Sequence, residues 1–334
     1  MGRLLPPRFL FALALVPVTA LLLSACGGSS SDAEESWESA PVIPELTDEL
    51  KQRFLIDVAV ADARGQNAEV FAKVGDSNTE LPNNLYGFAC RGVEFGEQQE
   101  VAPVVERYNR VVLDAAGGFG CEPVTSFSRY SAAARSGTYS IFPVNRIKDA
   151  LIPFGGPDPF CYPEEIALDC EIRLIRPRYT IIMIGTNDLG FDINYTNFQP
   201  GSKSAERLAL VVSRTRYAGS VPVLSNLPPS WVPVTPEIDE WGGIKLINRD
   251  IAKLAETLEV PLINLWGALT EEQMIDRGLG PDGVHLSVFG GPGQADALVN
   301  SVNLTDEALR YGANRRNLIW LQTLAELDRV ASGG

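Results

Sequence analysis

Short apolar runs recur along the chain, and each ends in small or polar residues. These runs are nearly continuous rather than alternating with polar residues. Continuous apolar runs are typical of strands that are buried on both faces of a sheet. The sequence therefore predicts strands at 69–77, 110–118, 179–188, 221–229 and 260–267.

Segments with helical spacing of apolar residues lie before and between these runs. They cover 46–66, where Thr47 can cap the helix, and later 204–219 and 243–259. Strands that alternate with helices predict a parallel sheet between helix layers, a three-layer α/β/α sandwich. In such sheets ligands bind beyond the carboxyl ends of the strands.

Polar residues follow the predicted strands where ligands are expected. Ser77 ends the first strand, Asn187 ends the 179–188 strand, and Asp282 and His285 lie in a glycine-flanked loop after the last strand. Each of them alone fits a structural role as a helix cap or turn residue. Because the strands are parallel, we expect all four to share one rim of the sheet.

His285 is the only histidine of the chain. Histidine is the usual proton shuttle of hydrolytic enzymes. A carboxylate three residues earlier, Asp282, can accept the Nδ1 proton and leave Nε2 free as a base. Ser77 opens a helix and can present its hydroxyl as a nucleophile. These residue types favour hydrolysis through a covalent intermediate.

The blocks "GDS", a glycine-bearing loop, "GTND" and "DGVH" occur in this order over roughly residues 68 to 290. In this order they resemble the four blocks of the SGNH hydrolases, also called the GDSL family. The resemblance implies a flavodoxin-like α/β/α fold and a serine hydrolase acting on carboxylic esters. It also implies that Ser77 is the nucleophile, His285 the general base and Asp282 its orienting partner.

The same resemblance implies an oxyanion hole. Its donors are the side-chain amide of Asn187, the N–H of Ser77 and the N–H of a glycine in the second block. Gly137 in "ARSGTYS" is the best match for that glycine. Gly117 or Gly118 in "AAGGFG" is the alternative.

The sequence departs from the family pattern directly after the serine. Leu or Ile is frequent there in the family, whereas this chain has Asn78, followed by Thr79 and Glu80. We expect these polar side chains to deny a long acyl chain an apolar wall. This predicts that acetyl to butyryl esters are cleaved better than chains of about eight carbons or more. A glycan O-acetyl ester is the expected natural target.

Other functions stay open on the same residues. One is a lipase or lysophospholipase of the same family, and another is a non-catalytic carbohydrate-binding lipoprotein on the same fold. Trp231 and Trp241 fit either a sugar platform or the core. A two-metal phosphoesterase would need several histidines, so no metal or other cofactor is expected.

The first residues, "MGRLLPPRFLFALALVPVTALLLSAC", have the pattern of an export signal ending in a lipobox. We expect a signal peptide at 1–25, a lipidated Cys26, a flexible tether at 26–45 and a hydrolase domain at 46–334. The protein would then be exported and held by its lipid alone outside the cytoplasmic membrane. The alternative is an ordinary signal peptide followed by an unmodified cysteine.

Acidic residues outnumber basic ones by 42 to 28, and the formal net charge is −14. This charge disfavours nucleic acids and anionic lipid surfaces as partners. The expected partner is a small-molecule or glycan ester.

Four cysteines remain besides Cys26. An even number in an exported chain predicts two disulfides, whose pairing the sequence leaves open. A zinc site is the rival interpretation, although no C-x-x-C pair is present. These cysteines are Cys90, Cys121, Cys161 and Cys170.

Overall fold

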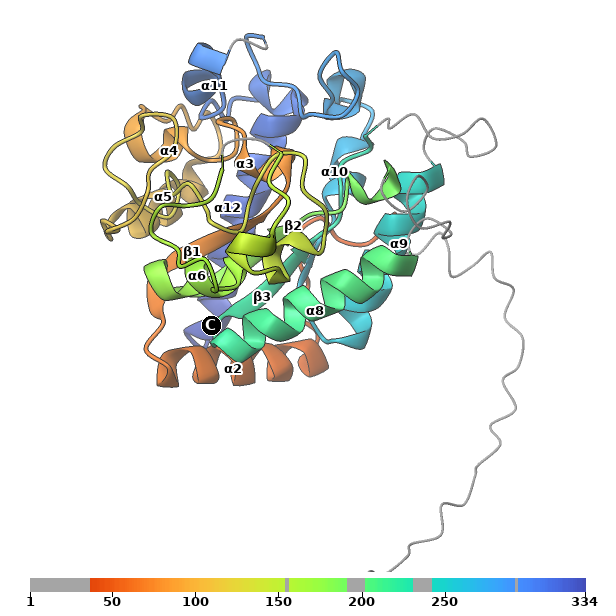
Figure 1. Cartoon of the computed structure of the whole chain (residues 1–334). Helices are drawn as coiled ribbons and strands as arrows, with labels where there is room; N and C mark the ends of the chain where they lie inside the picture. Colours follow the sequence, from red (N-terminus) through yellow and green to blue (C-terminus); the bar gives the residue numbers. More distant parts are fainter. Residues whose placement is uncertain (1–36, 154–155, 191–201, 231–241, 292–293) are drawn as a thin grey trace, which may run out of the picture.

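The computed structural model describes residues 37–153, 156–190, 202–230, 242–291 and 294–334 (Figure 1). The expected signal peptide, Cys26, Trp231 and Trp241 lie outside these ranges. At the centre is a parallel sheet in the order β1-β2-β3-β4. Its strands are β1 (Asn67–Gly75), β2 (Pro177–Met183), β3 (Val221–Ser225) and β4 (Leu262–Ile263).

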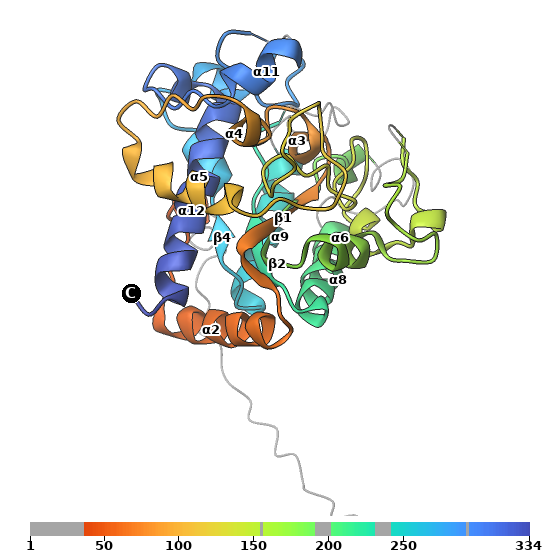
Figure 2. The ribbon, with the colours of Figure 1, turned by 90° about the vertical axis from the view of Figure 1, so that its left-hand side faces the viewer.

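Helices cover both faces of the sheet, as Figure 2 shows. On one side lie α6 (Ala167–Ile175) and α8 (Ser202–Ala218), with α9 (Gly242–Thr257) packed beside α8. On the other side lie α5 (Ala102–Asn109) and α12 (Gly312–Ala331). The fold is therefore the predicted three-layer α/β/α sandwich.

The two ends of the sheet differ in what covers them. Helix α2 (Asp48–Ala63) lies below the amino ends of the strands, and β1 runs from there up to the short helix α3 (Figure 2). Loops and short helices gather at the carboxyl ends. Among them are α3 (Ser77–Glu80), α4 (Gly87–Cys90) and α11 (Gln294–Asn300). The other short helices are α10 (Leu265–Leu269), η1 (Gln99–Val101), η2 (Phe142–Val144), η3 (Ile147–Asp149), η4 (Ile275–Gly278) and η5 (Ala308–Arg310).

Most of the predicted elements are present. Thr47 caps α2 by accepting a hydrogen bond from Leu50 N at 3.4 Å. The helices expected at 204–219 and 243–259 correspond to α8 and α9, and four of the five expected strands form the sheet.

The prediction of a strand at 110–118 is wrong. This segment packs its apolar side chains beside β1, but Leu113 N donates to the loop carbonyl of Val124 at 2.8 Å. The neighbour of β1 on the edge away from β2 is instead the segment around Ala134, which forms a parallel bridge with Gly75. This bridge places the loop that follows it at the carboxyl end of the sheet.

The folded part of the chain begins before residue 46. Trp37 is buried and packs against Trp266 with ring centroids 5.8 Å apart. Asn264 Nδ2 donates to the carbonyl oxygens of Trp37, Glu38 and Ala40. The described residues 37–40, which fall in the expected tether, therefore pack against the rest of the protein.

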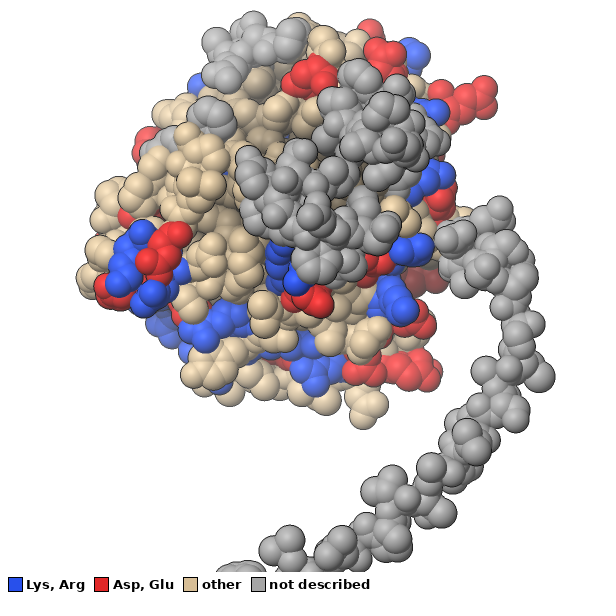
Figure 3. Space-filling model, turned by 45° about the vertical axis from the view of Figure 1, so that its right-hand side comes forward, with Lys and Arg blue, Asp and Glu red and all other residues tan. Residues whose placement is uncertain are grey.

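Charged side chains of both signs are interspersed on the face in Figure 3. Ion pairs among the described residues include Lys148 with Glu164 and Arg178 with Asp62, both at 2.7 Å. The net negative charge therefore does not gather into one acidic patch on this face. Within the described residues, no helix has the length and apolar character needed to cross a membrane.

Two disulfides fasten the long loops. Cys90 is bonded to Cys121 and Cys161 to Cys170, with Cα atoms 5.4 Å and 5.6 Å apart. Among the described residues, Cys161 and Cys170 also form the one cluster of possible metal ligands, together with Glu165. Both sulfurs are consumed by the disulfide, and Glu165 binds Arg173 at 2.7 Å.

Candidate active site

Ser77 is the first residue of α3 and follows directly on the end of β1. Asp76 caps this helix, because its carboxylate accepts a hydrogen bond from Asn78 N at 3.2 Å. The helix is only four residues long, so this cap fixes much of its geometry. The Ser77 side chain is thereby held at the carboxyl edge of the sheet, where the sequence predicts it.

His285 contacts both of its expected partners. Its Nε2 lies 2.9 Å from Ser77 Oγ, and its Nδ1 lies 2.7 Å from Asp282 Oδ2. Ser77 and His285 are 208 residues apart in sequence, so only the fold brings them together. The three side chains form a continuous hydrogen-bonded chain from hydroxyl to carboxylate.

Asp282 is held by its own loop. Its Oδ1 accepts hydrogen bonds from the backbone N–H groups of Val284 and His285, both at 2.9 Å. Partial burial opposes ionisation, but the hydrogen bonds from the His285 ring and from these N–H groups outweigh it. The pKa of Asp282 is therefore held below its usual range. The carboxylate is charged at neutral pH and able to orient the ring.

Asn187 lies in the turn after β2, and its Nδ2 donates to Thr138 O at 2.9 Å. The next residue, Asp188, accepts hydrogen bonds from the N–H and hydroxyl of Ser140 and from Arg207 Nη1. These contacts join the Asn187 turn to the loop that contains Gly137. The glycine-bearing loop and the "GTND" segment, the second and third expected blocks, therefore lie side by side.

Gly137 has a positive φ of 74°, a conformation that favours glycine. Within the described residues, the N–H groups of Ser77 and Gly137 have no hydrogen-bond partner. The alternatives in the "AAGGFG" segment pair with the segment around Arg129. Gly118 N donates to Ser128 O at 2.8 Å, and Gly117 forms a bridge with Arg129. The N–H of Gly118 is therefore occupied, and Gly137 stays the expected donor.

Polar side chains around Ser77 fasten the other loops of the site. Asp76 Oδ2 accepts hydrogen bonds from Gly185 N and Thr186 N at 3.4 Å and 3.2 Å. Burial raises the pKa of Asp76 to about 6, although these hydrogen bonds favour its ionised form. Sequence reasoning missed this role, for which the signal was a carboxylate at the very end of a buried strand.

Asn78 and Glu80 are likewise turned into the protein. The Asn78 amide binds the loop around His285, and Glu80 Oε2 accepts a hydrogen bond from Ser136 N at 2.6 Å. Thr79 Oγ1 donates to Met183 O at 3.0 Å. All three are buried, and the expectation that they offer a long acyl chain no apolar wall stays a prediction.

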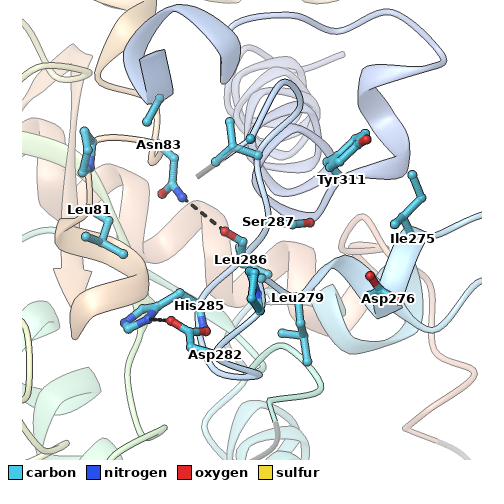
Figure 4. Close-up of a pocket in the computed structure, with 16 residues that line it drawn as sticks. Leu81, Asn83, Ile275, Asp276, Leu279, Asp282, His285, Leu286, Ser287 and Tyr311 are labelled. Atoms are coloured by element: carbon cyan, nitrogen blue, oxygen red, sulfur yellow. Dashed lines mark hydrogen bonds and ion pairs between the residues drawn. The ribbon is translucent and has the colours of Figure 1, made fainter. Parts of the chain in front are cut away.

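A cavity of about 710 Å³ adjoins the site. In Figure 4, Asp282 and His285 lie at one edge of it, across from Ile275 and Tyr311. Most of its walls are apolar, so it is suited to an apolar group. The apolar residues that line it are Leu81, Pro82, Ile275, Leu279, Pro281, Leu286, Val288, Ala297 and Tyr311.

Residues 164–290 match the model of the GDSL-like lipase/acylhydrolase family. This part of the chain is similar to a GDSL-like lipase/acylhydrolase domain. The matched segment includes Asn187, Asp282 and His285, whereas Ser77 precedes it. The match supports an ester-hydrolysing enzyme, as the sequence predicts.

Several solved structures are similar to this chain. An α/β hydrolase from the metagenome of Lake Arreo, Spain, is 16% identical over 79% of this chain and 96% of its own, with a TM-score of 0.41. A GDSL-like lipase from Bacteroides thetaiotaomicron is 14% identical over 83% and 97%, with a TM-score of 0.42. An acetylxylan esterase from Geobacillus stearothermophilus is 14% identical over 78% and 94%, with a TM-score of 0.41. No curated protein matches the sequence.

Proposed function

We propose that this GDSL-like enzyme is a serine esterase that works through Ser77, His285 and Asp282. The observation that carries the proposal is the pair of contacts made by the His285 ring, at 2.9 Å to Ser77 Oγ and 2.7 Å to Asp282 Oδ2. A ring held between a hydroxyl and a carboxylate can accept a proton at Nε2 while Asp282 stabilises the charge that forms.

The reaction proceeds in two halves. Ser77 Oγ attacks the ester carbonyl carbon as its proton moves to His285 Nε2. The tetrahedral intermediate then expels the alcohol, which takes the proton from Nε2, and an acyl-enzyme remains. Water, deprotonated by the same nitrogen, attacks the acyl-enzyme and releases the carboxylic acid, and the proton returns to Ser77.

The negative charge of the tetrahedral oxygen is stabilised by three donors in the proposal. These are the Asn187 amide and the N–H groups of Ser77 and Gly137. Support comes from the hydrogen bond between Asn187 Nδ2 and the carbonyl oxygen of Thr138, the residue that follows Gly137. Fixed donors of this kind stabilise charge that exists only in the transition state.

We assign the apolar cavity to the alcohol part of the ester. His285 lines the cavity, whereas Ser77, Gly137 and Asn187 do not. The departing alcohol oxygen must lie within reach of His285 Nε2, so the alcohol extends toward the histidine side of the site. The proposed substrate is an ester with an apolar alcohol, as in the lipase alternative. The short-acyl preference stays a prediction.

Export with a lipid anchor at Cys26 stays part of the proposal. The two disulfides support an oxidising compartment, because such bonds are rare in the cytosol.

Glycan O-acetyl esters stay a second candidate substrate. The expected preference for a short acyl group is the one argument for them.

Replacing the proposed nucleophile and base tests the function. Ser77→Ala and His285→Ala should each remove nearly all ester hydrolysis, and the double variant should be little worse, because the pair acts as a unit. Either variant keeping more than about a tenth of the rate would contradict the assigned roles. Circular dichroism of each variant confirms that the fold is kept.

A cavity-filling variant tests the substrate assignment. Ala297 lines the cavity, and Val299 on the same helix is exposed. Ala297→Phe should lower kcat/KM for octyl acetate about tenfold or more and leave methyl acetate unchanged, while Val299→Phe should change neither. An equal loss on both esters, or a loss confined to long-acyl methyl esters, would contradict the assignment to the alcohol.

A further inference from the structure

The backbone on both sides of His285 is bound by one side chain. We propose that Asn78 is a positioning residue that holds His285 in register with Ser77. The inference rests on the proposed function, since it concerns the same base. It assigns a purpose to the residue at which this chain departs from the usual family pattern.

The contacts of the Asn78 amide are complementary. Its Nδ2 donates to Val284 O at 3.2 Å, and its Oδ1 accepts a hydrogen bond from Leu286 N at 3.2 Å. The side chain is almost fully buried, at 1% exposure. A buried amide that uses both its donor and its acceptor holds the intervening residue at two points.

Asn78 is itself immobilised next to the nucleophile. Its N–H donates to Asp76 Oδ1 at 3.2 Å, and its carbonyl oxygen accepts a hydrogen bond from Arg316 Nη1 at 2.8 Å. The fully buried Arg316 also donates to Asn83 O at 2.7 Å. Because Asn78 follows Ser77 directly, its amide couples the positions of nucleophile and base.

The loop that carries His285 needs such a restraint. The side chains of His285 and Asp282 are 36% and 54% exposed, so packing alone does not fix them. Ser230 Oγ also donates to Val284 O, at 3.0 Å, but Asn78 alone binds the Leu286 N–H among the described residues. A base displaced by about 1 Å from its partner can cost about 100-fold in rate.

Leucine at position 78 would remove both hydrogen bonds at nearly constant volume. Asn78→Leu should lower kcat about 10- to 100-fold with KM nearly unchanged, because it moves the base rather than the substrate. Asn84→Leu is the matched control, since Asn84 is equally buried but donates to Thr79 O, at 2.8 Å, and not to the His285 loop. This control should lower stability while leaving kcat within about twofold.

The pH dependence of kcat in Asn78→Asp distinguishes a positioning role from a purely structural one. A protonated carboxyl offers one donor and one acceptor, the two functions that the amide uses here, but its ionised form cannot donate to Val284 O. At each pH, the kcat of the variant is compared with that of the wild type. The ratio should be near one at low pH and should fall as pH rises. Circular dichroism at each pH reports whether the fold persists.

The outcomes separate this inference from the proposed function. An inactive wild-type protein would overturn the proposed function. A normal kcat in folded Asn78→Leu, or equal losses in Asn78→Leu and Asn84→Leu, would overturn the role of Asn78 alone. If Asn78→Leu does not fold, Asn78→Asp decides: a pH profile parallel to wild type overturns the inference, and an added loss at high pH supports it.

Discussion

The carboxylate of Glu80 binds the backbone N–H of Ser136, with 2.6 Å between Oε2 and N. Ser136 directly precedes Gly137, and Glu80 ends the helix that Ser77 begins. The other carboxylate oxygen of Glu80 accepts a hydrogen bond from the Tyr130 hydroxyl. Glu80 therefore links the helix of the proposed nucleophile to the loop of a proposed oxyanion donor.

Loss of this link should slow catalysis without preventing substrate binding. Glu80→Ala should lower kcat at least about tenfold with a smaller change in KM, because Gly137 loses its support. Glu80→Gln keeps an acceptor for Ser136 N and should restore much of the rate. Steady-state kinetics with one ester check this, and equal losses in both variants would contradict the positioning role.

Asn187 is expected to act only on charge that forms in the transition state. Asn187→Ala should lower kcat about 10²–10³-fold, with a smaller effect on KM. The measurement is kcat and KM on the ester that the wild-type enzyme cleaves best. An effect confined to KM would mean that Asn187 only binds substrate.

Asp76 should make a distinctive contribution to the pH dependence of stability. Burial raises its pKa from 3.8 to about 6, so between these values the folded protein holds this proton more tightly than the unfolded chain does. Its contribution to stability is therefore fully present below about pH 4 and decreases as pH rises to about 6. The change is of the order of 1–3 kcal/mol.

Comparison with Asp76→Asn isolates this contribution, because an amide does not titrate in that range. The difference in free energy of unfolding between wild type and variant should fall from pH 4 to pH 6, as measured by urea denaturation. Parallel curves for the two proteins would show that Asp76 does not bind its proton more tightly in the folded state.

The two disulfides should differ in how much they stabilise the fold. Cys90 and Cys121 close a loop of 31 residues, and Cys161 and Cys170 one of 9. A longer closed loop removes more entropy from the unfolded chain, so the first bond should contribute about 1 kcal/mol more. Urea denaturation of the two double-serine variants measures this, and a larger loss from the shorter loop would contradict it.

The positions of the candidate site residues could be predicted because they follow buried strands. The carboxyl ends of parallel strands share one edge of the sheet, so Ser77 and Asn187 were expected near each other without any knowledge of loops. Asp282 and His285 are close in sequence, which made their contact predictable as well.

The partners of the buried polar residues could not be predicted. Asn78 binds Val284, 206 residues away, and a polar residue after a nucleophile gives no sign of such a partner. Helix α12 was missed for a related reason. It buries Asn314, Arg316 and Asn317, whose side chains bind loop backbone, so its buried face is not uniformly apolar.

The central claim is that Ser77 is a nucleophile activated by His285, and covalent labelling tests it most directly. A fluorophosphonate should react with one residue per chain, mass spectrometry of peptides should place the adduct on Ser77, and His285→Ala should slow labelling at least about 100-fold. Failure to label the folded wild-type protein, an adduct on another residue, or labelling of His285→Ala at the wild-type rate would contradict the account.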